Sequence, residues 1–340
     1  MKYAQLGTTG VYVSRISLGA MTLGGRGDQV WDAVGALDAK DGDRLVGVAL
    51  DHGVNLIDTA DVYAGGESEE ILGQVLGSRR RDVVLATKMT ARTGTGPNDV
   101  GQSRMYIMRS LEDSLRRLRT DHIDLYQIHN FDPVTPFEES LSALDDAVRQ
   151  GKIRYVGASN LTAWQTMKAL GVSERQGWAR FASLQSHYSL SARDIEREVL
   201  PVVRDQGLGL LVWSPLAGGL LSGKFDRDGE RDGGGRRATL EFPPVDRERT
   251  YDVVDVLRRV AARHEVGVAR VALAWLLARP GVTSAIVGAK RVDQLAENLA
   301  AVDLELTGED VAELDAVSAL PMEYPGWIQA DLSYRYPLPA

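Results

Sequence analysis

The sequence contains no cysteine among its 340 residues, and this absence excludes several kinds of chemistry. Without cysteine there is no disulfide, no thiolate nucleophile and no sulfur-ligated metal site. A net positive charge is missing too: the formal net charge is −8, whereas a nucleic-acid surface needs clustered lysine and arginine to neutralise phosphates. The densest basic patches, residues 79–81 and 116–119, each close a predicted helix, where cations complement the helix dipole. We therefore expect neither a disulfide framework nor a nucleic-acid partner.

Long apolar runs are also missing. The most apolar helical stretch, residues 271–278, is far too short to span a bilayer. The first five residues carry no apolar core of the kind found in signal peptides. These features predict a cytoplasmic protein that has no membrane partner.

Two nucleotide-binding motifs are absent or incomplete. No Gly-x-Gly-x-x-Gly follows a predicted strand, so a doubly wound dinucleotide fold has no support. Residues 218–225 have the spacing of a P-loop, but Phe225 stands where a Ser or Thr hydroxyl must reach magnesium. This argues against nucleotide hydrolysis, although a glycine-rich backbone followed by Lys224 can still cradle a pyrophosphate.

The sequence does contain a series of short β-rich runs separated by amphipathic helical stretches. The runs cover residues 14–19, 54–57, 83–87, 123–128, 155–158, 181–184, 210–212 and 284–287. Their alternation with helical stretches predicts a single α/β domain over residues 1–340, a (β/α)8 TIM barrel. Turn signals at Gly7 and Gly10 predict a β-hairpin over residues 3–13, before the first barrel strand.

The segments between the runs predict the helices and one unusual loop. Helices are expected over residues 43–52, 67–76, 103–118, 136–150, 162–170, 194–206, 251–264, 270–278, 292–301 and 309–319. Gly171 is a natural stop for the fifth of them. Residues 24–41 are predicted to form a loop, and the tail from Tyr324 is predicted to be irregular. The long loop after strand seven, residues 215–249, is rich in Gly, Asp and Arg, which is typical of a binding-site lid or of disorder.

Polar residues stand where several of the β-runs end. In a parallel barrel these ends converge on one face, so Asp58, Tyr63, Lys88 and His129 are expected to meet in one pocket. Each alone has a structural explanation, such as a turn cap or a surface ion pair. Together they form a chemical unit, because a tyrosine hydroxyl with a pKa near 10 is a poor acid unless its phenolate is stabilised. A buried lysine ammonium does that, an aspartate keeps the lysine charged, and the histidine can orient a carbonyl oxygen.

With these residues the chain resembles the aldo-keto reductase family over nearly all of its length. Residues 55–63 are similar to the family's strand-two signature, and residues 157–160 and 213–219 to its nicotinamide-holding and pyrophosphate segments. The resemblance implies that Asp58, Tyr63, Lys88 and His129 are catalytic. It assigns cofactor binding to Ser159, Asn160, Gln185, Trp213, Ser214, Pro215, Leu216, Gly218, Lys224, Gly288, Lys290, Gln294, Glu297 and Asn298.

The same resemblance implies the reaction: reduction of an aldehyde or ketone with NADPH, with Tyr63 as general acid. No metal is required, because the phenol supplies the electrophilic assistance that zinc gives in other dehydrogenases. Lys290 and Arg237 are the residues expected at the adenosine 2′-phosphate. Arg237 lies in a segment similar to a phosphate-contacting one in the potassium-channel β-subunit branch of the family.

Two alternatives to a reductase are considered, and the substrate is not specified. A Schiff-base aldolase could use Lys88, but it would leave Trp213 and Gly218 without a purpose. A nicotinamide-binding regulatory subunit would keep the same cofactor site and turn over slowly. Trp31 either contributes to the substrate pocket or packs, and the loops around it leave aldehydes, ketones and sugar-derived carbonyls open.

Overall fold

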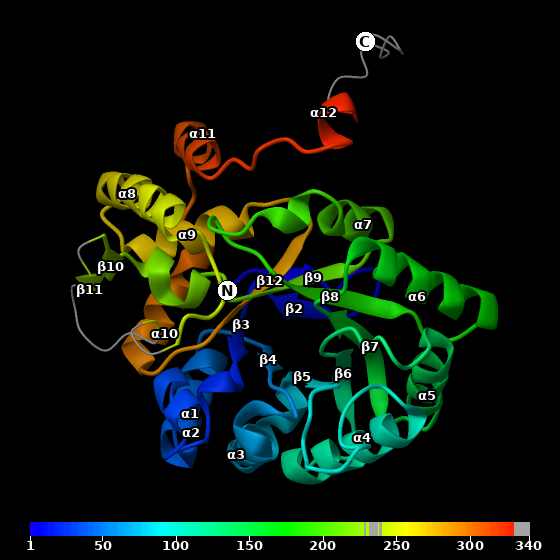
Figure 1. Ribbon diagram of the computed structural model, residues 1–340. Helices are drawn as coiled ribbons and strands as arrows, with labels where there is room; N and C mark the ends of the chain where they lie inside the picture. Colours follow the sequence, from blue (N-terminus) through cyan, green and yellow to red (C-terminus); the bar gives the residue numbers. More distant parts are fainter. Residues whose placement is uncertain (228, 231–236, 238–239, 330–340) are drawn as a thin grey trace.

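The computed structural model has the predicted TIM barrel, ringed by helices (Figure 1). It describes residues 1–227, 229–230, 237 and 240–329. Eight parallel strands close in the order β12-β3-β4-β5-β6-β7-β8-β9. Their bounds are β3 (Ile16–Gly19), β4 (Leu56–Asp58), β5 (Val84–Met89), β6 (Ile123–Ile128), β7 (Ile153–Ser159), β8 (Phe181–His187), β9 (Gly209–Trp213) and β12 (Val282–Val287).

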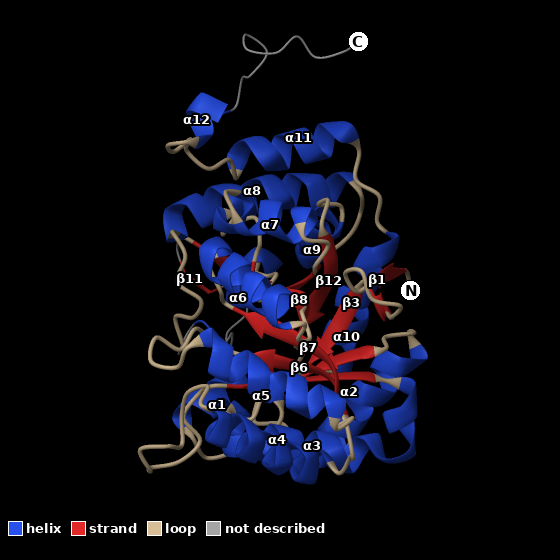
Figure 2. Cartoon of the chain, turned by 90° about the vertical axis from the view of Figure 1, so that its right-hand side faces the viewer, coloured by secondary structure: helices blue, strands red, loops and turns tan. Residues whose placement is uncertain are grey.

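The helices cover the outside of the barrel (Figures 1 and 2). They are α1 (Gln29–Val34), α2 (Ala39–Asp51), α3 (Glu67–Leu76), α4 (Arg104–Leu118), α5 (Phe137–Arg149), α6 (Ala163–Gln176), α7 (Val199–Asp205), α8 (Arg247–Arg263), α9 (Val268–Leu277), α10 (Val292–Leu299), α11 (Gly308–Val317) and α12 (Gly326–Gln329). Their apolar faces and the outward faces of the strands form the main hydrophobic core. Among the described residues, no helix combines the length and apolarity needed to cross a membrane.

The predicted N-terminal hairpin packs with the inside of the barrel. It consists of β1 (Tyr3–Gln5) and β2 (Tyr12–Ser14), paired antiparallel. Leu6 and Val13 from this region are fully buried in a second, smaller cluster, together with the strand residues Leu56, Ala86, Leu125, Leu211 and Ile286. An apolar layer therefore fills the barrel interior next to the hairpin.

Strand alternation places polar residues one step beyond this apolar layer. Side chains two positions apart in a strand point to the same face. Two positions after Leu56, Ala86, Leu125 and Leu211 come Asp58, Lys88, Gln127 and Trp213. The alternation thus carries these side chains to the inner face at the carboxyl ends of the strands, where TIM barrels hold their sites.

The region predicted as a loop over residues 24–41 contains helical structure. Here α1 is present, and α2 begins at Ala39 rather than residue 43. The reason is capping: the side chains of Asp28 and Asp38 each accept backbone N–H groups of the helix that follows, at 2.9–3.2 Å. Each aspartate is an N-cap signal, but the glycines of this region favoured the prediction of a loop.

Four other segments differ from the prediction. Helix α6 continues past Gly171 and ends at Gly177, whose left-handed φ of 66° suits a C-cap. The helix expected over 194–206 is a 3₁₀ turn followed by α7, because a continuous helix would put Pro201 in its interior. The tail contains the short helix α12, and α8 begins at Arg247, capped by Asp246. Nine residues of the predicted loop over 215–249, namely 228, 231–236 and 238–239, lie outside the described residues.

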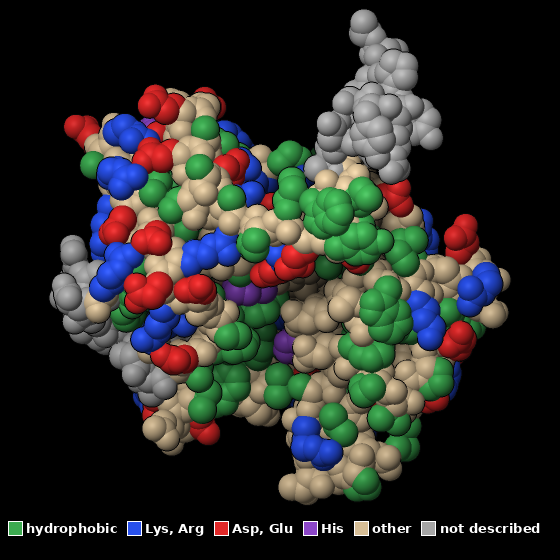
Figure 3. All heavy atoms as spheres, turned by 45° about the horizontal axis from the view of Figure 1, so that its top comes forward, with side chains coloured by type: hydrophobic (Ala, Val, Ile, Leu, Met, Phe, Trp, Pro, Cys, Tyr) green, Lys and Arg blue, Asp and Glu red, His purple; other side chains and the backbone are tan. Residues whose placement is uncertain are grey.

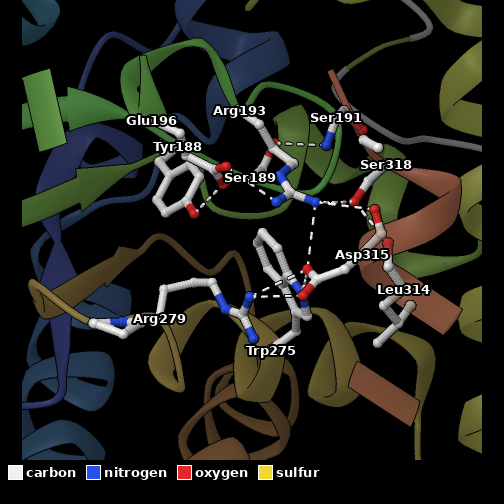
Figure 4. Close-up of polar contacts among 12 residues, drawn as sticks. Tyr188, Ser189, Ser191, Arg193, Glu196, Trp275, Arg279, Leu314, Asp315 and Ser318 are labelled. Atoms are coloured by element: carbon white, nitrogen blue, oxygen red, sulfur yellow. Dashed lines mark hydrogen bonds and ion pairs between the residues drawn. The ribbon is translucent and has the colours of Figure 1, made fainter. Parts of the chain in front are cut away.

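A polar cluster fastens α11 to the barrel (Figure 4). Asp315 of α11 accepts hydrogen bonds from Trp275 Nε1 at 2.9 Å, from Arg279 at 3.0 Å and from Arg193 at 3.3 Å. Arg193 follows β8, and Trp275 lies in α9. Because charge-assisted hydrogen bonds are stronger than neutral ones, this cluster fixes α11 over α9 and the segment after β8.

Candidate functional site

A cavity of about 610 Å³ opens at the carboxyl ends of the barrel strands. Figure 3 shows a hollow with histidine side chains in it. Most of the predicted site residues line the cavity: Asp58, Tyr63, His129, Ser159, Asn160, Gln185, Trp213, Ser214, Pro215, Leu216, Gly218, Lys224, Gly288, Lys290 and Gln294. In the described part of the chain, Lys88, Arg237, Glu297 and Asn298 do not line it.

Lys88 is fully buried and joins Asp58 to Tyr63. Its Nζ lies 2.5 Å from Asp58 Oδ1, 2.8 Å from the Thr59 carbonyl oxygen and 3.2 Å from the Tyr63 hydroxyl. An ammonium has three N–H donors, so these three acceptors use all of them. Because Lys88 is the donor to Tyr63, the phenol proton of Tyr63 is not consumed in this contact.

The charge of Lys88 is fixed by its surroundings. Burial acts to lower the pKa of its ammonium, but Asp58 and then Tyr63 more than offset this, so the pKa of Lys88 is raised above its usual value. Lys88 is therefore an ammonium at neutral pH. An ammonium 3.2 Å from the Tyr63 oxygen favours the phenolate over the phenol.

Tyr63 faces aromatic groups on two sides. Its ring centroid lies 5.8 Å from that of His129 at an interplanar angle of 78°, and 6.2 Å from that of Trp31 at 59°. Trp31 belongs to α1, the helix that the sequence analysis missed. Trp31 packs against Tyr63 but does not line the cavity, so a role for Trp31 in a substrate pocket stays a prediction.

His129 is a neutral imidazole in this site. Burial first, and the charge of Lys88 second, lower the pKa of His129 to about 3. The backbone N–H of His129 donates to the Met89 carbonyl at 2.8 Å, while Nδ1 is buried with no hydrogen-bond partner among the described residues. A neutral ring of this kind can orient a polar substrate atom, but it carries no imidazolium proton to donate as an acid.

Asn160 connects the ends of three strands beside the tetrad, the name used here for Asp58, Tyr63, Lys88 and His129. Its Nδ2 donates to the His129 carbonyl at 3.0 Å and to Asn130 Oδ1 at 3.2 Å, and its Oδ1 accepts from Trp213 Nε1 at 2.9 Å. The neighbouring Ser159 hydroxyl donates to the Gln185 carbonyl at 2.9 Å. These contacts fix the indole plane of Trp213 with respect to His129.

Trp213 is covered by two aromatic rings that sequence reasoning did not find. His187 stacks on it at a centroid distance of 4.6 Å, and Phe242 stacks on it at 5.7 Å with planes 4° apart. Phe242 and Trp213 both line the cavity, whereas His187 does not. No sequence motif marks Phe242. His187 carried a signal, since it ends barrel strand β8 as Asp58 ends β4.

The segment after Trp213 forms a tight turn that points backbone groups toward the cavity. Ser214, Ala217, Gly218 and Gly219 all have left-handed φ angles, between 50° and 101°. The Gly218 N–H donates to the Ser214 hydroxyl at 3.0 Å. A Cβ on Gly218 would lie only 2.7 Å from the Phe242 carbonyl oxygen, so this position requires glycine.

Arg237 is buried behind this turn rather than exposed in the cavity. Its Nε donates to the Ala217 carbonyl at 3.0 Å, and Nη2 donates to the Pro243 carbonyl. The guanidinium therefore ties the turn to the segment that carries Phe242. Contact between Arg237 and a phosphate stays a prediction.

The far end of the cavity lies between β12 and α10. Lys290 Nζ donates to the Ala33 carbonyl at 2.8 Å, and the Lys290 N–H donates to Gln294 Oε1 at 3.1 Å. Glu297 forms an ion pair with Arg270 at 2.7 Å, and Asn298 is buried. Lys290 and Gln294 thus face the cavity, while Glu297 and Asn298 support the helix behind it.

Gln127 is a further residue that the sequence analysis passed over. Its Nε2 lies 3.2 Å from Asp58 Oδ2, and Gln185 Nε2 lies 2.8 Å from the same oxygen. The alternation of the strand held the signal: Leu125 faces the barrel interior, so a polar residue at 127 faces it too.

A closed parallel barrel whose strand ends bring a tyrosine, an ammonium, a carboxylate and a neutral imidazole together has the architecture of a carbonyl-reducing oxidoreductase. Comparison with known proteins gives the same class. The family model described as "Aldo/keto reductase family" matches residues 15–319. The chain therefore belongs to the aldo/keto reductase family.

Three relatives illustrate the range of that family. The chain is 39% identical over 329 residues to an uncharacterized oxidoreductase, YrpG, of Bacillus subtilis (strain 168), covering 93% of this chain and 96% of the relative. It is 38% identical to a probable voltage-gated potassium channel subunit beta of Arabidopsis thaliana, covering 89% and 92%. It is 34% identical to the versiconal hemiacetal acetate reductase of Aspergillus parasiticus, covering 96% and 99%.

Proposed function

We propose that this protein reduces an aldehyde or ketone with NADPH and that Tyr63 is the general acid. The observation that carries the proposal is the contact of the Lys88 ammonium with both Tyr63, at 3.2 Å, and Asp58, at 2.5 Å. Such a contact makes a phenol a usable proton donor near neutral pH, which an isolated tyrosine is not.

The residues present fit a nicotinamide dinucleotide. The cavity of about 610 Å³ reaches from Tyr63 past Trp213 to Lys290, and its size is typical of small-molecule sites. The left-handed turn at Gly218 and Gly219 suits close approach of a pyrophosphate, and the N-terminus of α10 adds a positive dipole end beside Lys290. The ammonium of Lys290 suits a 2′-phosphate, which favours NADPH over NADH.

Each tetrad residue has a separate task in the proposed reaction. When bound, the reduced nicotinamide supplies the hydride. Tyr63 donates its phenol proton to the carbonyl oxygen, and Lys88 stabilises the phenolate that forms. Asp58 keeps Lys88 charged, and the neutral ring of His129 orients the carbonyl oxygen beside Tyr63.

The contacts of Lys88 argue against the aldolase alternative. A Schiff-base lysine must be neutral and must reach the substrate. Lys88 is fully buried, has a raised pKa and directs its three donors at Asp58, Thr59 and Tyr63. These contacts suit a lysine that stabilises the Tyr63 phenolate rather than one that attacks a carbonyl.

One observation favours a second candidate function, that of a slow nicotinamide-binding regulatory subunit. The chain is 38% identical to a probable voltage-gated potassium channel subunit beta. A regulatory protein would bind the cofactor in the same cavity but would turn over rarely, so turnover separates the two candidates.

The test is a panel of aldehydes, ketones and sugar-derived carbonyls, with NADPH oxidation measured under multiple-turnover conditions. We expect steady turnover with at least one substrate and none with Tyr63→Phe. If NADPH binds but every carbonyl gives at most a single turnover, the regulatory candidate replaces the reductase.

A further inference from the structure

The two oxygens of the Asp58 carboxylate have different partners. Oδ1 accepts from Lys88 at 2.5 Å, while Oδ2 accepts from Gln185 at 2.8 Å and from Gln127 at 3.2 Å. Asp58, Gln127 and Gln185 are at most 3% exposed. Away from bulk water, each lone pair of the carboxylate depends on these protein donors.

The position of Gln127 follows from the strand register. In the barrel sheet Gln127 of β6 pairs with Lys88 of β5 on one side and with Gly157 of β7 on the other. A Cβ on Gly157 would lie 3.1 Å from Gln127 Cγ. Gly157 therefore leaves the space into which the Gln127 side chain extends across the barrel interior.

Chemistry also fixes which end of the Gln127 amide faces Asp58. A carboxylate only accepts hydrogen bonds, so the NH₂ group of each amide must point at it. The Gln127 Oε1 is left facing Gln185 Nε2, at 3.4 Å. Gln127 and Gln185 together form an amide pair behind the carboxylate, on the side opposite Lys88.

We propose that Gln127 is a positioning residue for proton transfer: with Gln185 it holds Asp58 as an oriented anion, which keeps the Lys88 ammonium directed at Tyr63. This inference rests on the proposed function of Tyr63. Without the Gln127 donor, Asp58 Oδ2 loses a buried hydrogen-bond partner, and the charged carboxylate is less well stabilised. Lys88 then has a weaker counter-charge, and the Tyr63 phenolate is less stabilised.

The titratable groups facing this unit make the pH effect interpretable. Asp58, Lys88, Tyr63 and His129 meet there, from β4, β5, the turn after β4 and the end of β6. His129 has a pKa of about 3 and the pKa of Lys88 is raised, so neither changes charge between about pH 6 and 9. Asp61, which follows β4, has a pKa raised to about 7 by burial first and by the charge of Glu69 second. A pH transition in that range is therefore assigned to Tyr63 only where the phenolate absorbance shows it.

The test uses Gln127→Met, which keeps the length of the side chain and removes its donors. Tyr63 ionisation is read as the phenolate absorbance of each protein minus that of its Tyr63→Phe counterpart. We expect Gln127→Met to raise the pH of Tyr63 ionisation by roughly half a unit to one unit. The shift is small because the lost hydrogen bond acts on Tyr63 only indirectly, through Asp58 and Lys88. The falling limb of the reduction profile should move up by the same amount, with the plateau lowered about threefold to tenfold. NADPH affinity should stay unchanged, since Gln127 does not line the cavity in the described structure.

Three further variants separate this role from packing. Gln127→Glu should restore the wild-type ionisation pH, since the introduced carboxyl shares one proton with Asp58 and still donates to it. Gln127→Asn has a shorter amide that cannot reach Asp58, so it should raise the pH of Tyr63 ionisation as Gln127→Met does. It replaces Gln127→Met in the test if that variant does not fold. Ser183→Ala is the matched control, because the Ser183 hydroxyl is buried in the same interior with no partner among the described residues. Its loss should change neither the ionisation pH of Tyr63 nor the pH profile of reduction.

The outcomes distinguish this inference from the proposed function. If carbonyl reduction is normal, and neither Gln127→Met nor Gln127→Asn moves the ionisation pH or the profile, the role of Gln127 is overturned while the reductase stands. If no carbonyl is reduced but Gln127→Met raises the ionisation pH, the reductase fails, and the effect of Gln127 on Tyr63 ionisation stands without a role in proton transfer to a carbonyl. A shift as large in Ser183→Ala would also overturn it, because the effect would then come from packing.

Discussion

The two ends of the cavity are held in different ways. At the Tyr63 end, Asp58, Lys88 and Gln127 lie on barrel strands, are almost fully buried and contact one another directly. At the Lys290 end, here called the loop end, the Lys290 ammonium donates to the Ala33 carbonyl of α1, in the connection between β3 and β4. We therefore expect that the strand end needs no rearrangement for the proposed reaction, whereas Lys290 must release Ala33 to bind a ligand. Substitutions at the Tyr63 end should therefore affect turnover, and substitutions at the Lys290 end should affect cofactor affinity.

The largest effect is expected at Tyr63. Tyr63→Phe removes the proposed proton donor and leaves the ring in place between His129 and Trp31. We expect turnover to fall about 10²- to 10⁴-fold with the dissociation constant of NADPH nearly unchanged. Steady-state kinetics and fluorescence titration measure the two quantities. A variant that keeps more than a tenth of wild-type turnover would show that Tyr63 is not the general acid.

Lys88→Met should lower both activity and stability. It leaves Asp58 buried without its counter-charge, which costs about 3–5 kcal/mol of unfolding free energy in comparable buried pairs. Asp58→Asn should do less harm to turnover, because it acts through Lys88. The raised pKa of Lys88 keeps it an ammonium in mildly alkaline solution, so the wild-type loss of reduction as pH rises belongs to Tyr63.

Denaturant unfolding and pH–rate profiles check this prediction. The double variant Lys88→Met/Asp58→Leu should recover stability without activity, since no unpaired charge remains. Recovery of turnover in that double variant, or a reduction profile that is flat into alkaline pH with chemistry rate-limiting, would contradict the coupling of Lys88 to Tyr63.

The strand end could be predicted from the sequence, and the reason is periodicity. The β-runs end on Asp58, Lys88 and His129, and alternation alone places such residues on the inner face of a barrel. Gln127 was available from the same rule but was passed over as part of an apolar run. The eight strands were predicted from their β-rich runs, and the hairpin from the turn signals at Gly7 and Gly10.

The loop end could not be predicted to the same depth. The stacking of Phe242 on Trp213 depends on Arg237 holding two carbonyls that are distant from one another in the chain, and no local pattern encodes that contact. Helix α1 carried a readable N-cap at Asp28, but its position over Tyr63 depends on tertiary contacts such as Lys290 with Ala33. The 2′-phosphate assignments therefore stay predictions.

Lys290→Ala should raise the dissociation constant for NADPH about tenfold and leave that for NADH unchanged. A charge-assisted contact with a phosphate is worth roughly 1.5–3 kcal/mol, and part of this offsets the lost contact with Ala33. Arg116→Ala is a control, because that exposed guanidinium pairs with Asp113 and does not line the cavity. Arg237→Ala should weaken both cofactors, since its contact with Ala217 shapes the turn. Fluorescence titration decides, and equal weakening of both cofactors by Lys290→Ala would contradict the assignment.

Phe242→Ala should strengthen the binding of NADPH and NADH alike, by about twofold to tenfold. The Phe242 ring lies on the cavity side of Trp213, where a nicotinamide would stack, so a ligand must displace an aromatic contact worth roughly 0.5–1.5 kcal/mol. Trp213→Leu serves as the opposite control, since it removes the platform and should weaken binding. Weaker cofactor binding in Phe242→Ala would mean that the ring supports the ligand instead of competing with it.

The smallest effect on function is expected at Asp61, which lies behind the tetrad on the helix side of β4. It is 2% exposed; Oδ2 accepts from Ser110 at 3.0 Å, and Oδ1 has no partner within the described residues. Burial first, and the charge of Glu69 second, raise the pKa of Asp61 to about 7. Asp61→Asn should leave turnover nearly unchanged and alter only how stability depends on pH.

The direction follows from the raised pKa. Between the unfolded value of 3.8 and about 7, the folded state binds a proton that the unfolded state has released, so this contribution to stability is complete below pH 3.8 and is lost as pH rises through 7. The amide introduced by Asp61→Asn is neutral at every pH, so the variant should gain roughly 1–3 kcal/mol relative to wild type between pH 5 and pH 8, at 1.36 kcal/mol per pKa unit. Urea unfolding of both proteins at the two pH values measures the difference. A stability difference between variant and wild type that stays constant from pH 5 to pH 8 would show that Asp61 is already ionised in the fold.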